Sequence, residues 1–404
     1  MATRIVRDAG DCTTLARMIN ALLACSKFTD RPADLEDALR DATRRVLASA
    51  NGASRAVVAM AEAEVQADPE GRITVDARGH ATLRAAGGVW SAGRFEAPTI
   101  ASLRARAAAR ATGAPTRLIL LDGEGPCTDI GAMQAAAPQG VLFQVASQFN
   151  ALEAPGPAVV PVANYLRDPT QGPRAAVSAF PGTFARHYAA PAPDGGRFVQ
   201  RHDGPQVELL ADAFSPAVAR VHNGYLSTRG VADDEALAAS LVENFERIRV
   251  GLHDDVAVPL GFNWDGAVEG DRRIAQAFTS TLAGGMYSDR PIHLGALARA
   301  CAQLQRAAYL GTLLGATALG ARAAVLTLIG GGVFSNPRAL IWSAIVEAVE
   351  ALDRDAPTGL TVIVNTRGLS ALVAREEALA AVRARGGAIV TLPRAPDAAP
   401  SIEG

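Results

Sequence analysis

The sequence predicts an α/β fold in which helices cover both faces of an open, mixed and mostly parallel sheet. Short apolar runs of the kind buried in such sheets recur at 118–121, 141–145, 324–329 and 360–364. Between the later runs, Ala- and Leu-rich stretches at 292–319 and 337–352 have the spacing of long helices. Successive strand and helix units build a layered sheet, and such sheets bind ligands beyond the carboxyl ends of their strands.

The remaining segments divide the chain into three parts. Residues 1–115 are predicted to be mainly helical, residues 116–395 to form the α/β domain, and residues 396–404 to be a C-terminal tail. Within the domain, a Pro- and Gly-rich segment followed by a helical stretch predicts an insertion at 190–248. Alternating residues then predict a strand at 249–259.

Composition excludes several classes of partner. The 404 residues are 49% hydrophobic with a formal net charge of -2, so the chain lacks the basic surface that nucleic acid selects. No apolar run approaches the roughly 18 residues that span a membrane, and no Sec-type signal is visible at the start. The four cysteines form no CxxC pair, which argues against a disulfide framework or a zinc site. We expect a cytoplasmic protein, or one exported by a route that leaves no such signal.

The most specific local pattern is the glycine triplet Gly330-Gly331-Gly332. It follows a predicted strand and precedes Pro337, a residue that the first turn of a helix tolerates. Main-chain amides at such a junction face bound anions, so we expect a phosphate or diphosphate there. No Lys-Ser or Lys-Thr follows, which excludes a Walker loop. The alternative is a tight turn without a ligand.

Two segments carry a resemblance to macrodomains. The run 325–345 resembles the second phosphate loop of that fold, where amides wrap the diphosphate of ADP-ribose and an aromatic residue, here Phe334, borders the distal ribose. The run 143–153 resembles the strand that ends in the Asn-bearing first loop. Asp129-Ile130 resembles the Asp-Ile pair that meets adenine, although Asp122 is a second candidate for that position.

The variant resembles the large poly(ADP-ribose) glycohydrolase-like macrodomains, which include the MavL-type bacterial effectors that act on ADP-ribosylated ubiquitin. This resemblance rests on 148–153, 168–173 and 276–280, and it covers about 93–365. It implies a three-layer αβα fold and a hydrolase that removes ADP-ribose from a modified protein, ubiquitin being one candidate, without a cofactor or metal. It also implies export into a host cell as an alternative to the cytoplasm. The chain departs from the glycohydrolases because no Gln-Glu-Glu follows its glycine triplet.

The contacts to ADP-ribose that this resemblance implies come from Asp129, Ile130, Gln148, Phe149, Asn150, Thr170, Gln171, Gly330, Gly331, Gly332, Val333, Phe334 and Asn336. Asn150 is expected to bind a ribose hydroxyl. The alternative for Gln148 and Asn150 is that their amides only bond neighbouring loops, as buried amides often do.

Cleavage of the glycosidic bond passes through an oxocarbenium-like state that a nearby carboxylate can assist. Glu153 and Asp168 are the first candidates, although Glu153 can also cap its loop and Asp168 can also start a turn before proline. Asp255 is a third candidate. Strict strand alternation places it with His253 on one face, and places Val250, Leu252, Asp254 and Val256 on the other.

Three alternatives stay open from the sequence. In the first, the chain is a reader that binds ADP-ribose without turnover, which the missing Gln-Glu-Glu favours. In the second, it is a metal-dependent ADP-ribosylhydrolase or phosphohydrolase, with a cation held by His253, Asp254, Asp255 and Asp265. In the third, it is a structural protein whose pocket holds none of these ligands.

Overall fold

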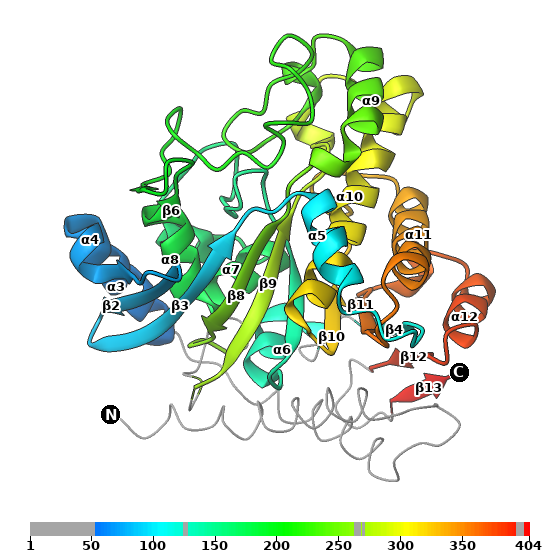
Figure 1. Ribbon diagram of the computed structural model, residues 1–404, viewed down its shortest axis with the longest axis horizontal. Coiled ribbons are helices and arrows are strands. Elements are labelled where there is room, and N and C mark those ends of the chain that lie inside the picture. The colour runs from blue at the N-terminus through cyan, green and yellow to red at the C-terminus, as the bar shows by residue number, and fades with distance from the viewer. Residues whose placement is uncertain (1–52, 124–127, 262–267, 269–270, 393–399) are drawn as a thin grey trace.

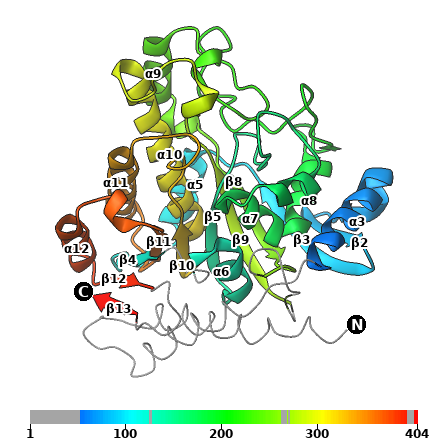
Figure 2. The same cartoon turned by 180° about the vertical axis from the view of Figure 1, so that it is seen from behind.

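The structure, a computed structural model, describes residues 53–123, 128–261, 268, 271–392 and 400–404. The helices expected before residue 53, the cysteines at 12, 25 and 127, and Asp265 lie outside these residues. The described chain forms one 11-stranded sheet with helices on both faces, and a separate two-stranded ribbon (Figure 1, Figure 2). None of the helices described there is long and apolar enough to cross a membrane.

The strands, in chain order, are β1 (Ile73–Val75), β2 (His80–Ala85), β3 (Gly88–Glu96), β4 (Arg117–Asp122), β5 (Val141–Ala146), β6 (Ala190–Pro191), β7 (Arg197–Phe198), β8 (Gly251–Ala257), β9 (Arg273–Thr279), β10 (Ala323–Leu326), β11 (Thr361–Asn365), β12 (Ala388–Thr391) and β13 (Ser401–Glu403). The helices are α3 (Ala53–Ala67), α4 (Pro69–Arg72), α5 (Ile100–Ala108), α6 (Ile130–Ala136), α7 (Gln171–Ser178), α8 (Phe180–Tyr188), α9 (Asp234–Glu243), α10 (Gly295–Leu319), α11 (Arg338–Asp355) and α12 (Arg375–Arg383). Short 3-10 helices are η3 (Val162–Arg167), η4 (Thr228–Gly230), η5 (Phe245–Arg247), η7 (Gly285–Tyr287) and η8 (Leu369–Ala371).

The centre of the sheet is parallel and its margins are antiparallel. The strand order is β1-β2-β3-β8-β9-β5-β10-β11-β4-β12-β13, and the strands from β9 to β12 run parallel, with Val325 of β10 paired to Phe143 of β5 and Ile363 of β11. Their carboxyl ends therefore meet at one edge, where ligands are expected.

Alternating strand residues build two cores. Leu118, Leu142 and Leu326 pack on one face, which α5, α9, α10, α11 and α12 cover. Ile119, Phe143 and Val325 pack on the other face against α6 and α7. A third cluster joins α3 and α8 to the antiparallel margin. This three-layer arrangement confirms the predicted α/β class with a mixed sheet, and the helices and strands predicted between 292 and 364 lie within a few residues of the observed ones.

The structure corrects two predictions about the margins. Residues 73–96 are not helical but form β1, β2 and β3, which extend the same sheet; the glycines at their turns concealed the alternation. The predicted C-terminal tail contains β13, which pairs antiparallel with β12. The helical stretch predicted in the insertion at 190–248 is present as α9, and the rest of the insertion is the β6-β7 ribbon, 3-10 helices and irregular chain (green, Figure 1).

The expected alternation of β8 is also wrong. A register shift between His253 and Val256 interrupts its pairing with β9, and Asp255 has a positive φ of 60°. As a result Leu252 packs in the core beneath α10, whereas Val256 packs on the opposite face beside α8, where His253 also lies. The bulge thus places Val256 on the same face as His253, which is buried and supports the site described next.

Candidate functional site

The carboxyl ends of β5, β10 and β11 open into a pocket with a volume of about 670 Å³. Its walls come from residues 146–148 after β5, 327–334 after β10 and 365–367 after β11, together with 153–155 and 168–172. Because these strands are neighbours in the sheet, the pocket spans three adjacent strand ends. A volume of this size lies within the range of small-molecule and cofactor sites.

The glycine-rich loop after β10 offers unused main-chain donors. Several of its amides close turns within the loop: Gly331 donates to Leu328 O at 3.0 Å, and Asn336 donates to Gly330 O at 3.0 Å. By contrast, no hydrogen bond within the described chain uses the amides of Gly332, Val333 or Phe334. All three residues line the pocket. Gly332 and Val333 are exposed and Phe334 is half-buried, so these donors are open to a ligand that enters the pocket, and a run of open amides suits an anion.

Buried side chains hold this loop in place from behind. The Asn336 side-chain amide donates to Leu282 O at 2.9 Å and to Phe334 O at 3.1 Å, and its Oδ1 accepts from Gln305 Nε2 of α10 at 2.8 Å. Tyr309 of α10 accepts from Ile329 N at 3.0 Å and donates to Thr327 O at 2.9 Å. Asn336, expected to contact the ligand, is instead a buried support of the loop and is not among the pocket's walls.

Two glycines of the loop leave space that a side chain would fill, one towards the protein and one towards the pocket. Gly330 has a φ of +73°, and a Cβ there would lie 2.5 Å from Thr281 Oγ1. Gly332 differs, since a Cβ there meets nothing within 4 Å. The first glycine is therefore required by the backbone, whereas the last leaves room for a ligand.

An aromatic cluster forms one side of the pocket. Tyr225 stacks on Tyr287 with ring centroids 5.1 Å apart, and Phe334 meets Tyr225 edge-on at 5.6 Å. All three line the pocket. Phe334 was expected here from the sequence. Tyr225 was missed because it comes from the insertion, where no periodic pattern marks it.

Glu153 is a buried acid in the pocket wall. Its side chain is enclosed, and its Oε2 has no hydrogen-bond partner in the described structure. Burial raises the pKa of Glu153 well above its ordinary value, and the nearby charge of Asp168 raises it further. Gly172 packs directly on this carboxyl group, because a Cβ there would lie 1.9 Å from Oε1. Such an acid keeps its proton at a pH where an exposed glutamate has lost it.

Asp168 and Gln148 complete this end of the pocket. Asp168 lines the pocket half-buried, and its Oδ1 accepts from Thr170 N at 2.9 Å. Gln148 bonds both main-chain groups of Ala154, accepting at 3.0 Å and donating at 3.0 Å, and so fixes the turn that carries Glu153. Gln148, Thr170 and Gln171 line the pocket as expected.

A fully buried arginine lies beneath this turn. The Arg186 guanidinium donates to Ala151 O at 2.9 Å, to His253 Nδ1 at 2.8 Å and to Thr183 Oγ1 at 3.0 Å, and lies 3.6 Å from the centre of the Phe278 ring. Burial lowers the pKa of Arg186 to about 9. Its positive charge lowers the pKa of Glu153, but burial and the charge of Asp168 have larger effects and raise it.

His253 is a neutral structural residue. An arginine can only donate, so His253 Nδ1 accepts from it, and His253 Nε2 donates to Ala92 O at 2.7 Å. Burial holds the pKa of His253 well below its ordinary value. The sequence placed His253 on a polar face of the strand, but its side chain is fully buried and is not exposed to solvent.

Besides Asn336, four expected ligand contacts do not line the pocket. Asn150 accepts from Leu152 N at 3.0 Å and donates to Gln206 Oε1 at 2.9 Å, so its amide bonds neighbouring loops, the alternative left open by the sequence. Phe149 points into the core and a different cavity. Asp129 caps α6 and pairs with Arg174, and Ile130 is buried beside it.

Asp255 lies at the other end of the strands. Its carboxylate pairs with Arg273 at 2.7 Å and His80 at 2.8 Å, beside a smaller cavity of about 250 Å³ that Gly140 at the start of β5 also lines. The structure thus separates Asp255 from Glu153 and Asp168. Among the described residues no group of three or more His, Cys, Asp or Glu side chains is arranged to hold a metal ion, and Asp265 of the alternative metal site lies outside these residues.

Comparisons with known proteins find similarity only at the level of solved structures. No family model and no curated protein sequence matches the chain. Among solved structures it is similar to poly(ADP-ribose) glycohydrolase from Deinococcus radiodurans in complex with ADP-ribose, with 12% identity, 72% of this chain and 93% of that chain covered, and a TM-score of 0.40. It is also similar to the glycohydrolase from Thermomonospora curvata, with 16% identity, 77% and 92% covered, and a TM-score of 0.35.

The pKa of Glu153 predicts a specific dependence of stability on pH. Between the ordinary value of 4.5 and the raised value, the folded chain binds a proton that the unfolded chain has lost. The free energy of unfolding should therefore fall as pH rises through that window, and the Glu153→Gln variant should lack this part of the fall. Urea denaturation at a series of pH values measures it, and equal pH slopes in the two proteins would contradict it.

Removal of the buried guanidinium should destabilise the fold. Arg186→Met leaves three buried acceptors without their donor, so we expect a loss of about 3–5 kcal/mol in the free energy of unfolding. The matched control is Arg247→Met at an exposed position, expected to change stability by less than about 0.5 kcal/mol. Chemical denaturation of both variants checks this, and a loss below about 1 kcal/mol for Arg186→Met would show that the network is dispensable.

Proposed function

We propose that the chain is an ADP-ribosylhydrolase, which binds ADP-ribose in the pocket at the carboxyl ends of β5, β10 and β11 and releases it from a modified protein. The observation that supports this best is one cavity that joins unbonded loop amides at Gly332–Phe334 to a buried acid, Glu153. The amides suit a diphosphate, and the acid suits cleavage of the bond at the distal ribose.

In this proposal, the order of the strands sets which end of ADP-ribose lies over which strand. In the sheet, β10 lies between β5 and β11, so the glycine-rich loop occupies the middle of the pocket. With the diphosphate at that loop, one end of the ligand extends over β11 towards Thr366 and Arg367, and the other over β5 towards Glu153. The exposed Arg338 in the first turn of α11 also lines the pocket and adds positive charge near the diphosphate. The adenine then lies above β11 and the distal ribose beside Glu153 and the aromatic cluster.

The two acids take different roles in bond cleavage. Glu153, kept protonated by burial and by its neighbour, donates its proton to the leaving atom of the acceptor side chain. Asp168, half-buried at the pocket wall, accepts a proton from the attacking water and stabilises positive charge on the ribose. One water is consumed, and the products are ADP-ribose and the unmodified side chain.

A protein is the proposed acceptor, with ubiquitin as one candidate on the strength of the sequence resemblance. Export into a host cell is also proposed from the sequence resemblance. The second candidate function is a reader without turnover. It is favoured by α11, which follows the glycine-rich loop and has no acidic residue in its first turn, so this helix supplies no counterpart of the Gln-Glu-Glu found in the glycohydrolases.

A charge placed at the open glycine should abolish ligand binding. Gly332→Glu brings a carboxylate beside the unbonded amides, where it repels a diphosphate, so we expect at least about a tenfold loss of affinity for ADP-ribose. Gly332→Ala, whose Cβ meets nothing within 4 Å, is the matched control and should bind within about threefold of wild type. Calorimetric titration measures both, and equal affinity in all three proteins would place the diphosphate elsewhere.

Removal of the acid should separate binding from turnover. Glu153→Gln keeps the size of the side chain but not its transferable proton, so we expect release of ADP-ribose from modified protein to fall about 10²–10⁴-fold. Affinity for ADP-ribose should stay near that of wild type, and wild-type turnover should decline as pH rises above the raised pKa of Glu153. Wild type that binds ADP-ribose but releases none from any modified protein would support the reader instead.

A further inference from the structure

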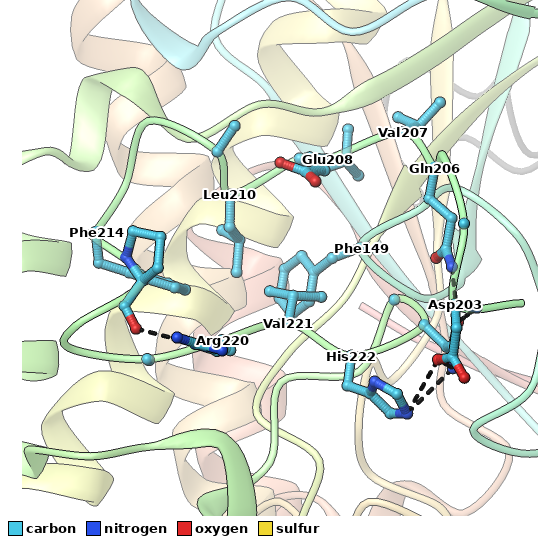
Figure 3. Close-up of a pocket in the computed structure, with 17 residues that line it drawn as sticks. Phe149, Asp203, Gln206, Val207, Glu208, Leu210, Phe214, Arg220, Val221 and His222 are labelled. Atoms are coloured by element: carbon cyan, nitrogen blue, oxygen red, sulfur yellow. Dashed lines mark hydrogen bonds and ion pairs between the residues drawn. The ribbon is translucent and has the colours of Figure 1, made fainter.

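The insertion forms a second cavity, with a volume of about 420 Å³ (Figure 3). Apart from Phe149, its walls come entirely from residues 203–224. Phe149, Leu210 and Val221 lie together at its centre in Figure 3, and Arg220, His222 and Asp203 lie along one side. The cavity therefore combines an apolar floor with a charged rim.

The two cavities share a thin wall. Gln148 and Tyr225 line the first pocket, whereas Phe149 and Gly224, their immediate neighbours in the chain, line the second. Phe149 donates its amide to Gly224 O at 2.8 Å, which joins the two segments. Gly224 has a φ of +82°, and a Cβ there would lie 2.6 Å from Asn150 Cγ, so the segments are pressed together. The second cavity thus borders the end of the first pocket that holds Glu153 and the aromatic cluster.

The chemistry of the second cavity does not suit a further nucleotide. Glu208 and Asp203 are exposed carboxylates among its walls, and they would repel a diphosphate. Glu208 and Arg220 belong to no ion pair within the part of the chain that the structure describes, so charges of both signs are available to a partner. An apolar centre with a charged rim is the arrangement by which protein surfaces recognise polypeptide.

We infer that this second cavity binds the polypeptide to which ADP-ribose is attached. The inference rests on the proposed function, because the ADP-ribosyl group in the first pocket brings its acceptor protein to this border. An apolar side chain of the acceptor occupies the space over Phe149 and Val221. Neighbouring basic and acidic side chains of the acceptor then pair with Glu208 and Arg220. The insertion selects the protein, while the strand ends select the nucleotide.

Filling the cavity tests the inference. Ala211 is an exposed wall residue outside the first pocket, so Ala211→Trp occupies the cavity, and Ala211→Ser is the matched control. Glu208→Arg, also exposed, reverses one rim charge. Release of ADP-ribose is measured from an intact ADP-ribosylated protein, and from the same protein digested to single modified amino acids, which keeps the linkage but removes the polypeptide. Affinity for free ADP-ribose is measured alongside.

For the intact protein, kcat/KM should fall about tenfold or more in Ala211→Trp and Glu208→Arg, mainly through a higher KM. In both variants, kcat/KM for the digest and affinity for free ADP-ribose should equal those of wild type. Ala211→Ser should match wild type in all three measurements. Equal losses on intact protein and digest, no loss on either, or a loss confined to poly(ADP-ribose) chains would overturn the inference. The proposed function fails separately, when wild type neither binds ADP-ribose nor releases it from the digest.

Discussion

The site depends on a stretch of main chain that is held open although its own amides remain unbonded. Few hydrogen bonds of its own hold the part of this loop at Gly332–Phe334, so its shape depends on contacts from behind. Here α10 and Asn336 supply the fixation: Tyr309 bonds the loop at Thr327 and Ile329, and Gln305 orients Asn336, which bonds Phe334. The donors are therefore arranged before any ligand arrives, and binding requires little reorganisation of the protein.

At the end of the pocket that holds Glu153, the surrounding residues fix a carboxyl group whose burial is unfavourable. Glu153 is enclosed beside a second carboxylate, and Gly172 leaves no freedom for it to move away. Gln148 holds the turn from one side, and Arg186 holds Ala151, which has a positive φ of 58°, from beneath. Strain and burial gathered at one turn are typical of functional sites, where the rest of the fold supplies the stability.

The sequence predicted those parts of the molecule that depend on local pattern. The parallel strands and the long helices follow from periodicity, and the glycine-rich loop follows from three glycines between a strand and a helix. Residues whose role depends on distant partners were missed or misplaced. Arg186 meets His253 across 67 positions of chain, and no local pattern reveals such a contact. The β8 bulge reversed the expected faces, and Asn150 carries the same side chain whether it binds a ribose or, as here, Gln206.

The hydrogen bond between Phe149 and Gly224 has a consequence for engineering the protein. It fastens the insertion to the strand end through main chain, and main-chain bonds tolerate changes of side chain on either partner. The buried residues Leu209, Leu210, Ala213 and Ala219 of the insertion also pack in the core, and Gln206 accepts a side-chain bond from Asn150. The exposed wall positions Glu208 and Ala211 are thus open to substitution, provided that these buried residues, the glycine at 224 and its neighbour Tyr225 are kept. Diversifying such exposed positions alone would give a library of variants that share one nucleotide site and differ in the surface presented beside it.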